Sequence, residues 1–336
     1  MKAAIWKSIN NIVVKEIDIP KIENGEVLIK VAYAGICGSD ITIFNGKHLT
    51  AKPPVILGHE FSGLIAESKS LYFKKGDRVV VEPLISCGIC KSCIEGNYHI
   101  CSNLKLLGIH ENGAFADYIK ADANKTLKIP DNIQLLEAAM IEPFSVALHS
   151  IDSSHMKIGD SVLVVGAGLI GAMTGLLALY HGARKVIISD LSEFRLNFAK
   201  KLGMITFNPN NNGDLTKYIL DNTDNNGIDI AFECAGIASS VKACLNSLGI
   251  KGKLIQVGIP KELIETDYRN IAYKEQEIIG VRIYSKGVFM RAINFLSDRN
   301  IILKDFVSDI FNLDNIIKAF ECTNDKNKCL KALIKF

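Results

Sequence analysis

A glycine-rich segment in the middle of the chain constrains the fold more than any other feature. Gly166-Ala167-Gly168-Leu169-Ile170-Gly171 follows an apolar run at 162–165 and opens a run at 169–180 that is rich in small apolar residues. After a strand, the first glycine allows a tight turn, the second lets the backbone approach a pyrophosphate, and the third lets the helix pack closely on the strand. A glycine turn without a cofactor is the alternative, but these flanks predict a dinucleotide-binding unit.

The residues around this motif repeat the same alternation. We expect strands at 161–165, 185–189, 228–233 and 253–257, and helices at 169–180, 193–202 and 239–248. This order predicts an α/β domain with a doubly wound parallel sheet. Asp190 ends the second of these strands, 19 residues after Gly171. An acidic residue there accepts hydrogen bonds from the adenosine ribose and repels a 2′-phosphate, which favours NAD over NADP.

The two ends of the chain have a different pattern. Short strands are expected at 1–7, 27–34, 78–81 and 113–118, separated by turn residues, which predicts a small β-barrel. Helices are expected at 135–140, after Pro143, and at 288–296 and 313–320, and a strand at 330–336 closes the chain. The Asn-rich stretches 208–213 and 221–227 are interpreted as loops.

Four of the nine cysteines lie in one cluster, Cys87, Cys90, Cys93 and Cys101. The spacing C-x2-C-x2-C-x7-C suits a tetrahedral zinc site in which four thiolates leave no open position, so the site is expected to be structural. Four free thiols are the first alternative. An iron–sulfur cluster is the second, but it has a shorter last gap and a following proline, whereas Ser102 follows here.

A second set of candidate metal ligands is spread along the chain. Cys37 lies in Cys37-Gly38-Ser39-Asp40, His59 and Glu60 follow Gly58, and Glu142 precedes Pro143. A thiolate, an imidazole and one or two carboxylates can hold a zinc ion and leave it a position for another ligand. A lone cysteine or histidine is usually structural, so the prediction depends on the whole set.

Composition excludes some classes of function. The 336 residues carry 39 basic and 36 acidic side chains, a net charge of +3, so there is no electrostatic footprint for nucleic acid. This also argues against a nucleic-acid-binding zinc ribbon at the cysteine cluster. We find no secretory signal and no apolar run of about 20 residues, and we therefore expect a soluble cytoplasmic protein without a membrane segment.

These motifs, in this order, resemble the zinc-dependent medium-chain dehydrogenases of the alcohol and polyol type. The segments 57–63, 108–115 and 140–146 are most similar to sorbitol, galactitol-phosphate and sugar-acid (gulonate or idonate type) dehydrogenases. The resemblance implies a GroES-like β-barrel catalytic domain at 1–144, completed by 281–336, and a Rossmann NAD-binding domain at 145–280. It also implies an active site between the two domains and a homodimer or homotetramer.

The resemblance implies roles for the candidate metal ligands. Cys37 and His59 match ligands of the catalytic zinc, and Glu60 matches a carboxylate that ligates the zinc or swings off it. Glu142 stands where polyol enzymes have a glutamate and classical alcohol dehydrogenases a cysteine, and Glu60 or Glu142 is expected to assist proton transfer by way of zinc-bound water. Ser39 matches the hydroxyl of the proton relay and contacts the substrate.

Further roles follow for the relay, the cofactor and the substrate. Many relatives have a histidine where this chain has Thr42, so the relay ends either at His48 or in water. Arg282 matches an arginine near the substrate, with a structural arginine as the alternative. The remaining residues expected at the cofactor are Gly166, Gly168, Leu169, Ile170, Gly171, Asp190, Arg195, Val257 and Gly258.

The function that the resemblance implies is hydride transfer. We expect interconversion of a secondary alcohol of a polyol, sugar phosphate or sugar acid with its ketone, with catalytic and structural zinc and with NAD. The alternatives are an L-threonine 3-dehydrogenase, a butanediol or other secondary-alcohol dehydrogenase, and a catalytically inactive regulatory relative.

Overall fold

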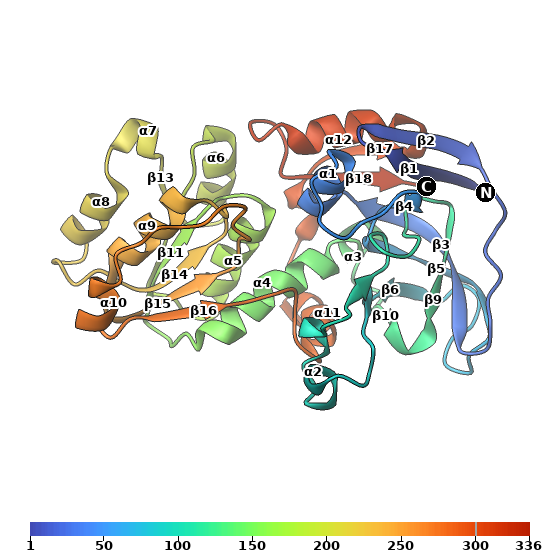
Figure 1. Cartoon of the computed structure of the whole chain (residues 1–336), viewed down its shortest axis with the longest axis horizontal. Helices are drawn as coiled ribbons and strands as arrows, with labels where there is room; N and C mark the ends of the chain where they lie inside the picture. The colour runs from blue at the N-terminus through green and yellow to red at the C-terminus, as the bar shows by residue number, and fades with distance from the viewer. Residues whose placement is uncertain (300) are drawn as a thin grey trace. The chain divides into compact units, whose positions relative to one another are not determined.

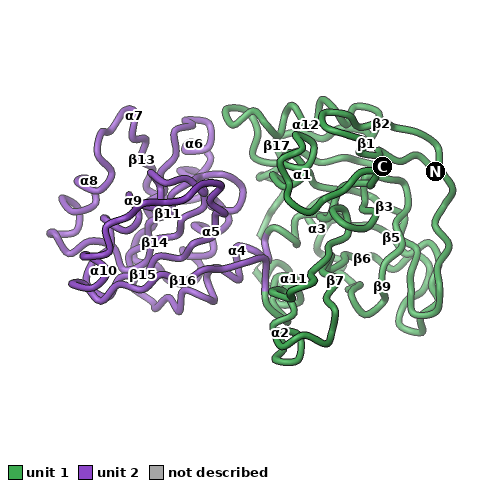
Figure 2. Tube along the Cα trace, in the orientation of Figure 1, with its two compact units in different colours: residues 1–143, 285–336 green, residues 144–284 purple. Residues whose placement is uncertain are grey.

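The computed structural model describes residues 1–299 and 301–336 (Figure 1). The chain forms two compact units (Figure 2). Unit 1 comprises Met1–Pro143 and Ser285–Phe336, and unit 2 comprises Phe144–Tyr284. No helix among the described residues is long and apolar enough to cross a membrane.

Unit 1 is built mainly from antiparallel strands. The central strand β3 (Glu26–Gly35) pairs with three neighbours, and its apolar residues are buried in the core. The order of the large sheet is β10-β6-β5-β3-β18-β17, with β9 also on β3; the strands are β10 (Thr126–Lys128), β6 (Arg78–Val81), β5 (Glu60–Ser68), β18 (Lys331–Lys335), β17 (Val307–Asn312) and β9 (Tyr118–Asp122). Two smaller sheets consist of β2 (Asn11–Glu16), β1 (Lys2–Ser8) and β4 (Val55–Ile56), and of β7 (Leu84–Ile85) with β8 (Lys105–Leu106).

Short helices connect these strands. The α-helices are α1 (Gly38–Phe44), α2 (Lys91–Ile94), α3 (Leu135–Ala138), α11 (Val288–Arg299) and α12 (Ile316–Asn324). The 3₁₀ helices are η1 (Tyr98–Ile100), η2 (Ala123–Lys125), η3 (Leu303–Phe306) and η4 (Leu313–Asn315). Because β17 and β18 are parallel, α12 serves as the crossover between them.

Unit 2 is a parallel sheet with helices (Figure 1). The strand order is β13-β12-β11-β14-β15-β16, with β13 (Ile205–Phe207), β12 (Lys185–Ser189), β11 (Ser161–Val165), β14 (Ile228–Glu233), β15 (Leu248–Gln256) and β16 (Glu277–Gly280). In chain order this is 3-2-1-4-5-6, the doubly wound topology. The helices are α4 (Ile141–Ser154), which starts at the end of unit 1, α5 (Leu169–Tyr180), α6 (Glu193–Lys201), α7 (Pro209–Asn212), α8 (Leu215–Asp221), α9 (Ala238–Ser247) and α10 (Arg269–Tyr273).

The predicted fold class, a GroES-like barrel domain and a Rossmann domain, is confirmed. The strand predicted at 113–118 is wrong, because β9 starts only at Tyr118. The N–H groups of Gly113, Ala114 and Phe115 donate instead to carbonyls of residues 56–58, which fixes this segment beside the loop that leads to β5.

Further boundaries differ from the prediction; the helix expected at 313–320, for example, is η4 followed by α12, which starts at Ile316. The stretch 208–213 contains the helix α7, because the Asn208 side chain caps it and Pro209 starts it. Helix α4 starts at Ile141 and includes Pro143, which is tolerated in a first turn. Strand β15 starts at Leu248, earlier than the expected 253.

Candidate metal centres and cofactor site

The four clustered cysteines meet in one loop of unit 1, around α2 and η1. The sulfur–sulfur distances are 3.5 Å for Cys87–Cys101 and Cys90–Cys93, 3.8 Å for Cys90–Cys101 and 4.0 Å for Cys87–Cys93. A tetrahedron with zinc–sulfur bonds of about 2.3 Å has sulfur–sulfur edges of about 3.8 Å. The loop therefore fits a zinc ion with four thiolate ligands and no open position.

Backbone amides of the loop point at these sulfur atoms. The N–H groups of Cys93 and Ser102 lower the pKa of Cys90 to about 6, and those of Ile89 and Cys90 lower the pKa of Cys87. Desolvation and the neighbouring thiols raise the pKa of Cys93 to about 11. Amides that donate to sulfur stabilise the thiolate, which is the form that binds metal.

Cys37, His59 and Glu60 come together at a second site in unit 1. Cys37 follows β3 and precedes α1, whereas His59 and Glu60 stand at the start of β5, which pairs with β3. One ligand atom of each residue lies within 4.8 Å of the other two. A thiolate, an imidazole and a carboxylate suit a zinc ion that keeps one position open for a small molecule.

Close backbone packing around Gly58 places His59. Gly58 has φ +93°, and a Cβ there would lie 2.7 Å from the ring of Phe115. A Cβ on Gly108 or Gly113 would overlap the backbone of Gly58. Only residues without a side chain allow this approach, which explains why the 57–63 and 108–115 segments carry glycines at these positions.

The fully buried carboxylate of Asp40 faces His59. Its Oδ2 accepts the N–H of Cys37 at 2.8 Å, and its Oδ1 lies 3.8 Å from His59 Nδ1. Burial raises the pKa of Asp40. A carboxylate beside one ring nitrogen is the usual way to orient a ligating histidine, and it leaves the other nitrogen for a metal.

Three buried polar atoms of this site have no hydrogen-bond partner among the described residues: Ser39 Oγ, Asp40 Oδ1 and His59 Nδ1. Buried polar atoms are normally paired. Burial by itself lowers the pKa of His59, but the charges of Asp40, Cys37 and Glu142 raise it well above its ordinary value. This concentration of negative charge and the unpaired serine hydroxyl fit a site built for a dication and an alcohol.

Glu142 lies in the first turn of α4 and is only 7% exposed. It is not one of the three residues whose ligand atoms cluster within 4.8 Å in the described chain, but its charge acts on His59. The structure therefore brings Glu60 into the ligand cluster and keeps Glu142 next to it. Which of the two carboxylates ligates the metal stays a prediction.

Lys331, which our sequence analysis did not single out, forms an ion pair with Glu60 inside unit 1. Both side chains are 1% exposed, and the Lys331 ammonium also donates to Ile36 O at 2.9 Å. Burial lowers the pKa of Lys331, but the charges of Glu60, Cys37 and Asp40, together with the hydrogen bond to Glu60, more than offset this, so the pKa is raised. A Cβ on Gly35 would overlap the Glu60 carboxylate and the end of the Lys331 side chain, so the glycine leaves room for this pair. The sequence signal that could have indicated this ion pair is a lysine at the start of the mostly apolar last strand, β18.

The glycine motif of unit 2 has the geometry of a phosphate site. Gly166 has φ +102°, and a Cβ on Gly171 would overlap Gly166 O. Gly168 is the N-cap of α5, and no side chain caps the helix. The nearest described atom to a Cβ at Gly168 would be Arg195 Nη1 at 3.7 Å. Free N–H groups with open space before them fit a pyrophosphate, and Leu169 and Ile170 start the helix.

Asp190 follows β12 and lies beside this loop. Its Oδ2 accepts the N–H of Ala167 at 2.7 Å, and its Oδ1 accepts the N–H of Ser192 at 2.9 Å. Arg195 Nη1 lies 3.9 Å from Asp190 Oδ2. Each carboxylate oxygen keeps a second lone pair, so Asp190 fits a ribose with two hydroxyl groups.

The remaining predicted residues also belong to unit 2. Val257 and Gly258 follow β15, and their N–H groups donate to Glu233 O at 2.9 and 2.8 Å. Arg282 is exposed and follows β16. The roles of these three residues at the nicotinamide and the substrate stay predictions.

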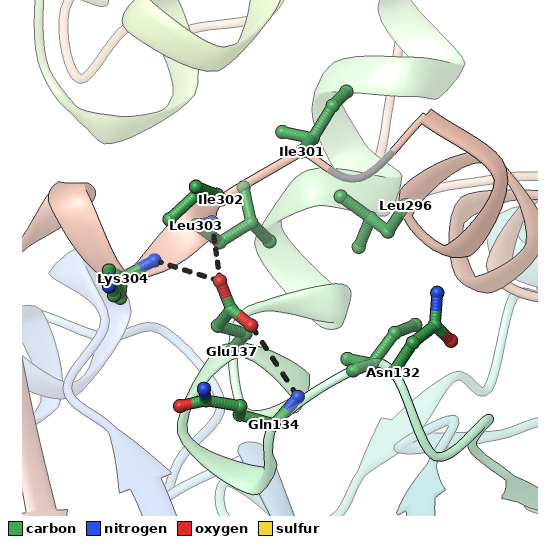
Figure 3. Close-up of a pocket in the computed structure, with 9 residues that line it drawn as sticks. Asn132, Gln134, Glu137, Leu296, Ile301, Ile302, Leu303 and Lys304 are labelled. Carbon is green, nitrogen blue, oxygen red and sulfur yellow. Dashed lines mark hydrogen bonds between the residues drawn. The ribbon is translucent and has the colours of Figure 1, made fainter.

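A separate cavity of about 240 Å³ in unit 1 contains none of the predicted site residues. Figure 3 shows the carboxylate of Glu137 in it, between α3 and the start of η3. The carboxylate accepts the N–H groups of Leu303, Lys304 and Gln134 at 3.0, 3.4 and 3.4 Å. These bonds join two segments of the fold and explain the partly buried acid without a ligand.

Lys331→Met is expected to lower the free energy of unfolding by about 3 kcal/mol, because it leaves the buried Glu60 carboxylate without its partner. Lys331→Arg keeps the positive charge, so its free energy of unfolding should fall much less. Adding Glu60→Gln to Lys331→Met should recover most of the loss. Urea denaturation followed by circular dichroism measures these differences.

Lys128→Met is the matched control for this cycle. Lys128 pairs with Asp77 at 2.8 Å, but its side chain is 53% exposed, so the loss should stay within about 1 kcal/mol. Equal losses for the two lysine variants would contradict the account of a buried, mutually dependent pair.

Comparison with known proteins identifies the family. The family model described as alcohol dehydrogenase GroES-like domain matches residues 23–131, and the one described as zinc-binding dehydrogenase matches 170–298. Sorbitol dehydrogenase of Bacillus subtilis is 36% identical, over 99% of this chain and 97% of its own. The 2-dehydro-3-deoxy-L-galactonate 5-dehydrogenase of Pseudoalteromonas atlantica is 34% identical, over 93% and 92%. An L-threonine 3-dehydrogenase of Pseudoalteromonas translucida is 32% identical, over 90% of each chain.

Solved structures agree with this result. A zinc-binding dehydrogenase from Sinorhizobium meliloti bound to NADP superposes with a TM-score of 0.94 at 30% identity, covering 100% of this chain and 99% of that one. The 2R,3R-butanediol dehydrogenase of Bacillus subtilis gives a TM-score of 0.93 at 30% identity, with the same coverage. The chain therefore belongs to the zinc-dependent medium-chain alcohol and polyol dehydrogenases, a family of NAD(P)-dependent oxidoreductases.

Proposed function

We propose that this chain interconverts a secondary alcohol of a polyol, sugar phosphate or sugar acid with the ketone, using NAD. The observation that carries the proposal is the acidic character of the buried site, where Glu60 and Glu142 accompany Cys37 and His59. A carboxylate at position 142 in place of a thiol is the feature that our sequence analysis associated with polyol enzymes. The names of the sorbitol and galactonate-type relatives support the same substrate class.

The proposed roles use residues of both units. Cys37, His59 and a carboxylate of Glu60 or Glu142 would hold a catalytic zinc ion, which supplies Lewis acidity toward a bound alcohol. The four-cysteine loop would hold a structural zinc ion. The glycine loop and Asp190 of unit 2 would position NAD, whose nicotinamide accepts the hydride.

Ser39 is the proposed first acceptor of the substrate's hydroxyl proton. Its Oγ is buried and has no partner among the described residues, so its hydroxyl is available to a bound alcohol. The Thr42 hydroxyl cannot extend the relay because it donates to Gly38 O at 2.9 Å, within its own helix.

His48 is a poor next acceptor for this proton. Its Nδ1 accepts the N–H groups of Thr50 and Ala51 at 3.3 and 3.1 Å, so that lone pair is already used. Burial and the nearby His110 lower the pKa of His48, which favours a neutral ring with its proton on Nε2. Of the two ends that the sequence left open, we therefore favour water after Ser39.

A substrate panel tests the proposed class. With NAD as cofactor, kcat/KM for at least one polyol, sugar phosphate or sugar acid should exceed the values for L-threonine and 2,3-butanediol by about tenfold or more. The reason is that the carboxylate that does not hold the zinc ion and the serine hydroxyl offer partners to a substrate with several hydroxyl groups. Initial rates of NADH formation measure it.

Cys37→Ser, assayed in parallel, controls for contaminating dehydrogenases and should lose nearly all activity. Turnover restricted to threonine or simple alcohols would contradict the proposal and favour the alternative suggested by the threonine and butanediol relatives.

Asp190→Ala should lower the preference for NAD over NADP by about tenfold or more, because it removes the charge that repels a 2′-phosphate. The ratio of kcat/KM values for the two cofactors measures this preference. Asp229→Ala is a matched control, since Asp229 accepts the N–H of Ser161 at 2.7 Å at the opposite edge of the same sheet. An unchanged ratio in Asp190→Ala would show that Asp190 does not face the ribose.

A further inference from the structure

A second acidic residue of unit 2, Glu233, is fully buried at the carboxyl end of β14. Its Oε1 accepts the N–H groups of Ala235 and Gly236, both at 2.8 Å, and the hydroxyl of Ser240 at 2.6 Å. Its Oε2 accepts the amide of Gln256 at 2.5 Å. All four donors are neutral, and no basic side chain of the described residues forms an ion pair with Glu233.

The groups around the Glu233 carboxylate donate hydrogen bonds to it but carry no positive charge that would neutralise it. Four hydrogen-bond donors satisfy the two carboxylate oxygens, and none of these donors brings a positive charge. The negative field reaches the neighbouring thiols, since burial and then the Glu233 charge raise the pKa values of Cys234 and Cys244. Glu233 is therefore a source of negative potential at this edge of the sheet.

The fold places the negative potential of Glu233 beside the part of the cofactor site that we assign to the nicotinamide. In a doubly wound sheet the dinucleotide crosses the carboxyl edge where the strand order reverses, here between β11 and β14. The Asp190 side of the sheet takes the adenosine half, so the ends of β14 and β15 take the nicotinamide half. A Cβ on Gly258, just after β15, would lie 2.7 Å from Glu233 Oε2. The carboxylate thus lies directly behind this edge.

We propose that Glu233 makes the protein favour the oxidised form of its nicotinamide cofactor over the reduced form. The two forms share the adenosine half and both phosphates, and they differ by one positive charge on the nicotinamide ring. An uncompensated carboxylate in a poorly screened interior attracts the cationic ring and is nearly indifferent to the neutral one. The inference rests on the nicotinamide cofactor of the proposed function and not on the choice of alcohol.

Binding of NAD⁺ and NADH to the zinc-loaded enzyme without substrate tests the inference. In Glu233→Gln the ratio Kd(NAD⁺)/Kd(NADH) should rise about tenfold, because the charge is lost while the shape is kept. Glu233→Asp keeps the charge, so its ratio should stay within about twofold of wild type even if both affinities fall. Calorimetric titration measures both constants.

A second variant tests the same charge with Glu233 in place. Gln256→Lys puts a cation beside Oε2, and it should raise the ratio in the same direction as Glu233→Gln. If Glu233→Gln does not fold, the ratio measured for Gln256→Lys tests the inference by itself.

Two controls separate charge from structure. Gln256→Leu removes the hydrogen bond to Oε2 and keeps the charge, so its ratio should not change. Asp190→Asn removes a carboxylate on the adenosine side, so it should change both affinities by the same factor.

Different results would overturn the inference about Glu233 and the assignment of the cofactor. An unchanged ratio in Glu233→Gln or Gln256→Lys would overturn the inference, and so would an equal shift in Glu233→Asp. A wild-type protein that binds neither form would overturn the cofactor assignment itself, and the inference with it.

Discussion

Buried negative charge is the constraint on which the structure of unit 1 depends. Asp40, Glu60 and Glu142 are all buried beside the thiol of Cys37. An uncompensated buried charge costs several kcal/mol, so such a group needs a counter-charge or several hydrogen-bond donors. Lys331 supplies one positive charge, to Glu60. The remaining anions around His59 are balanced most simply by a dication, which is the physical reason to read this cluster as a zinc site.

The strand order of the barrel makes this balance possible. Glu60 starts β5 and Lys331 starts β18, and both strands pair with β3, where Gly35 leaves room for the two side chains. The same pairing puts Cys37 just beyond the end of β3. The metal ligands and the positive charge of Lys331 therefore come from the ends of neighbouring strands of one sheet. The hydrogen bonds of that sheet fix their positions relative to one another.

In unit 2, hydrogen bonds satisfy two acids at the edge of the sheet: Glu233, which is fully buried, and Asp190, which is partly buried and also lies near Arg195. Asp190 and Glu233 end the two strands that flank β11, and backbone N–H groups satisfy both of them. Their charges order the loops at the carboxyl edge of the sheet and remain available to act on a ligand there. In the proposed cofactor site, Asp190 would lie on the adenosine side and Glu233 on the nicotinamide side, so one charge would serve recognition of the ribose and the other recognition of the redox state.

Features that depend on residues close together in the sequence were predicted correctly. The helix predicted at 169–180 has those bounds in the structure, and the spacing of the four cysteines predicted their cluster. The pair of Glu60 with Lys331 joins residues 271 positions apart, and nothing in either segment indicates that β5 and β18 flank the same strand. Glu233 was missed for a related reason, because its four donors come from the loop after β14, from helix α9 and from the end of strand β15. The segment 113–115 has strand-like residues, but its N–H groups donate to the carbonyls of residues 56–58.

The central claim is that the chain has one open metal site at Cys37 and His59 and a separate closed site in the cysteine loop. Metal analysis of the purified protein, of Cys37→Ser and of Cys90→Ser tests it most directly. The account predicts two zinc ions per wild-type chain, with the Cys37 variant losing one and keeping both its fold and the zinc of the loop. A wild-type chain with a single zinc ion, or a Cys37 variant that keeps both, would contradict it.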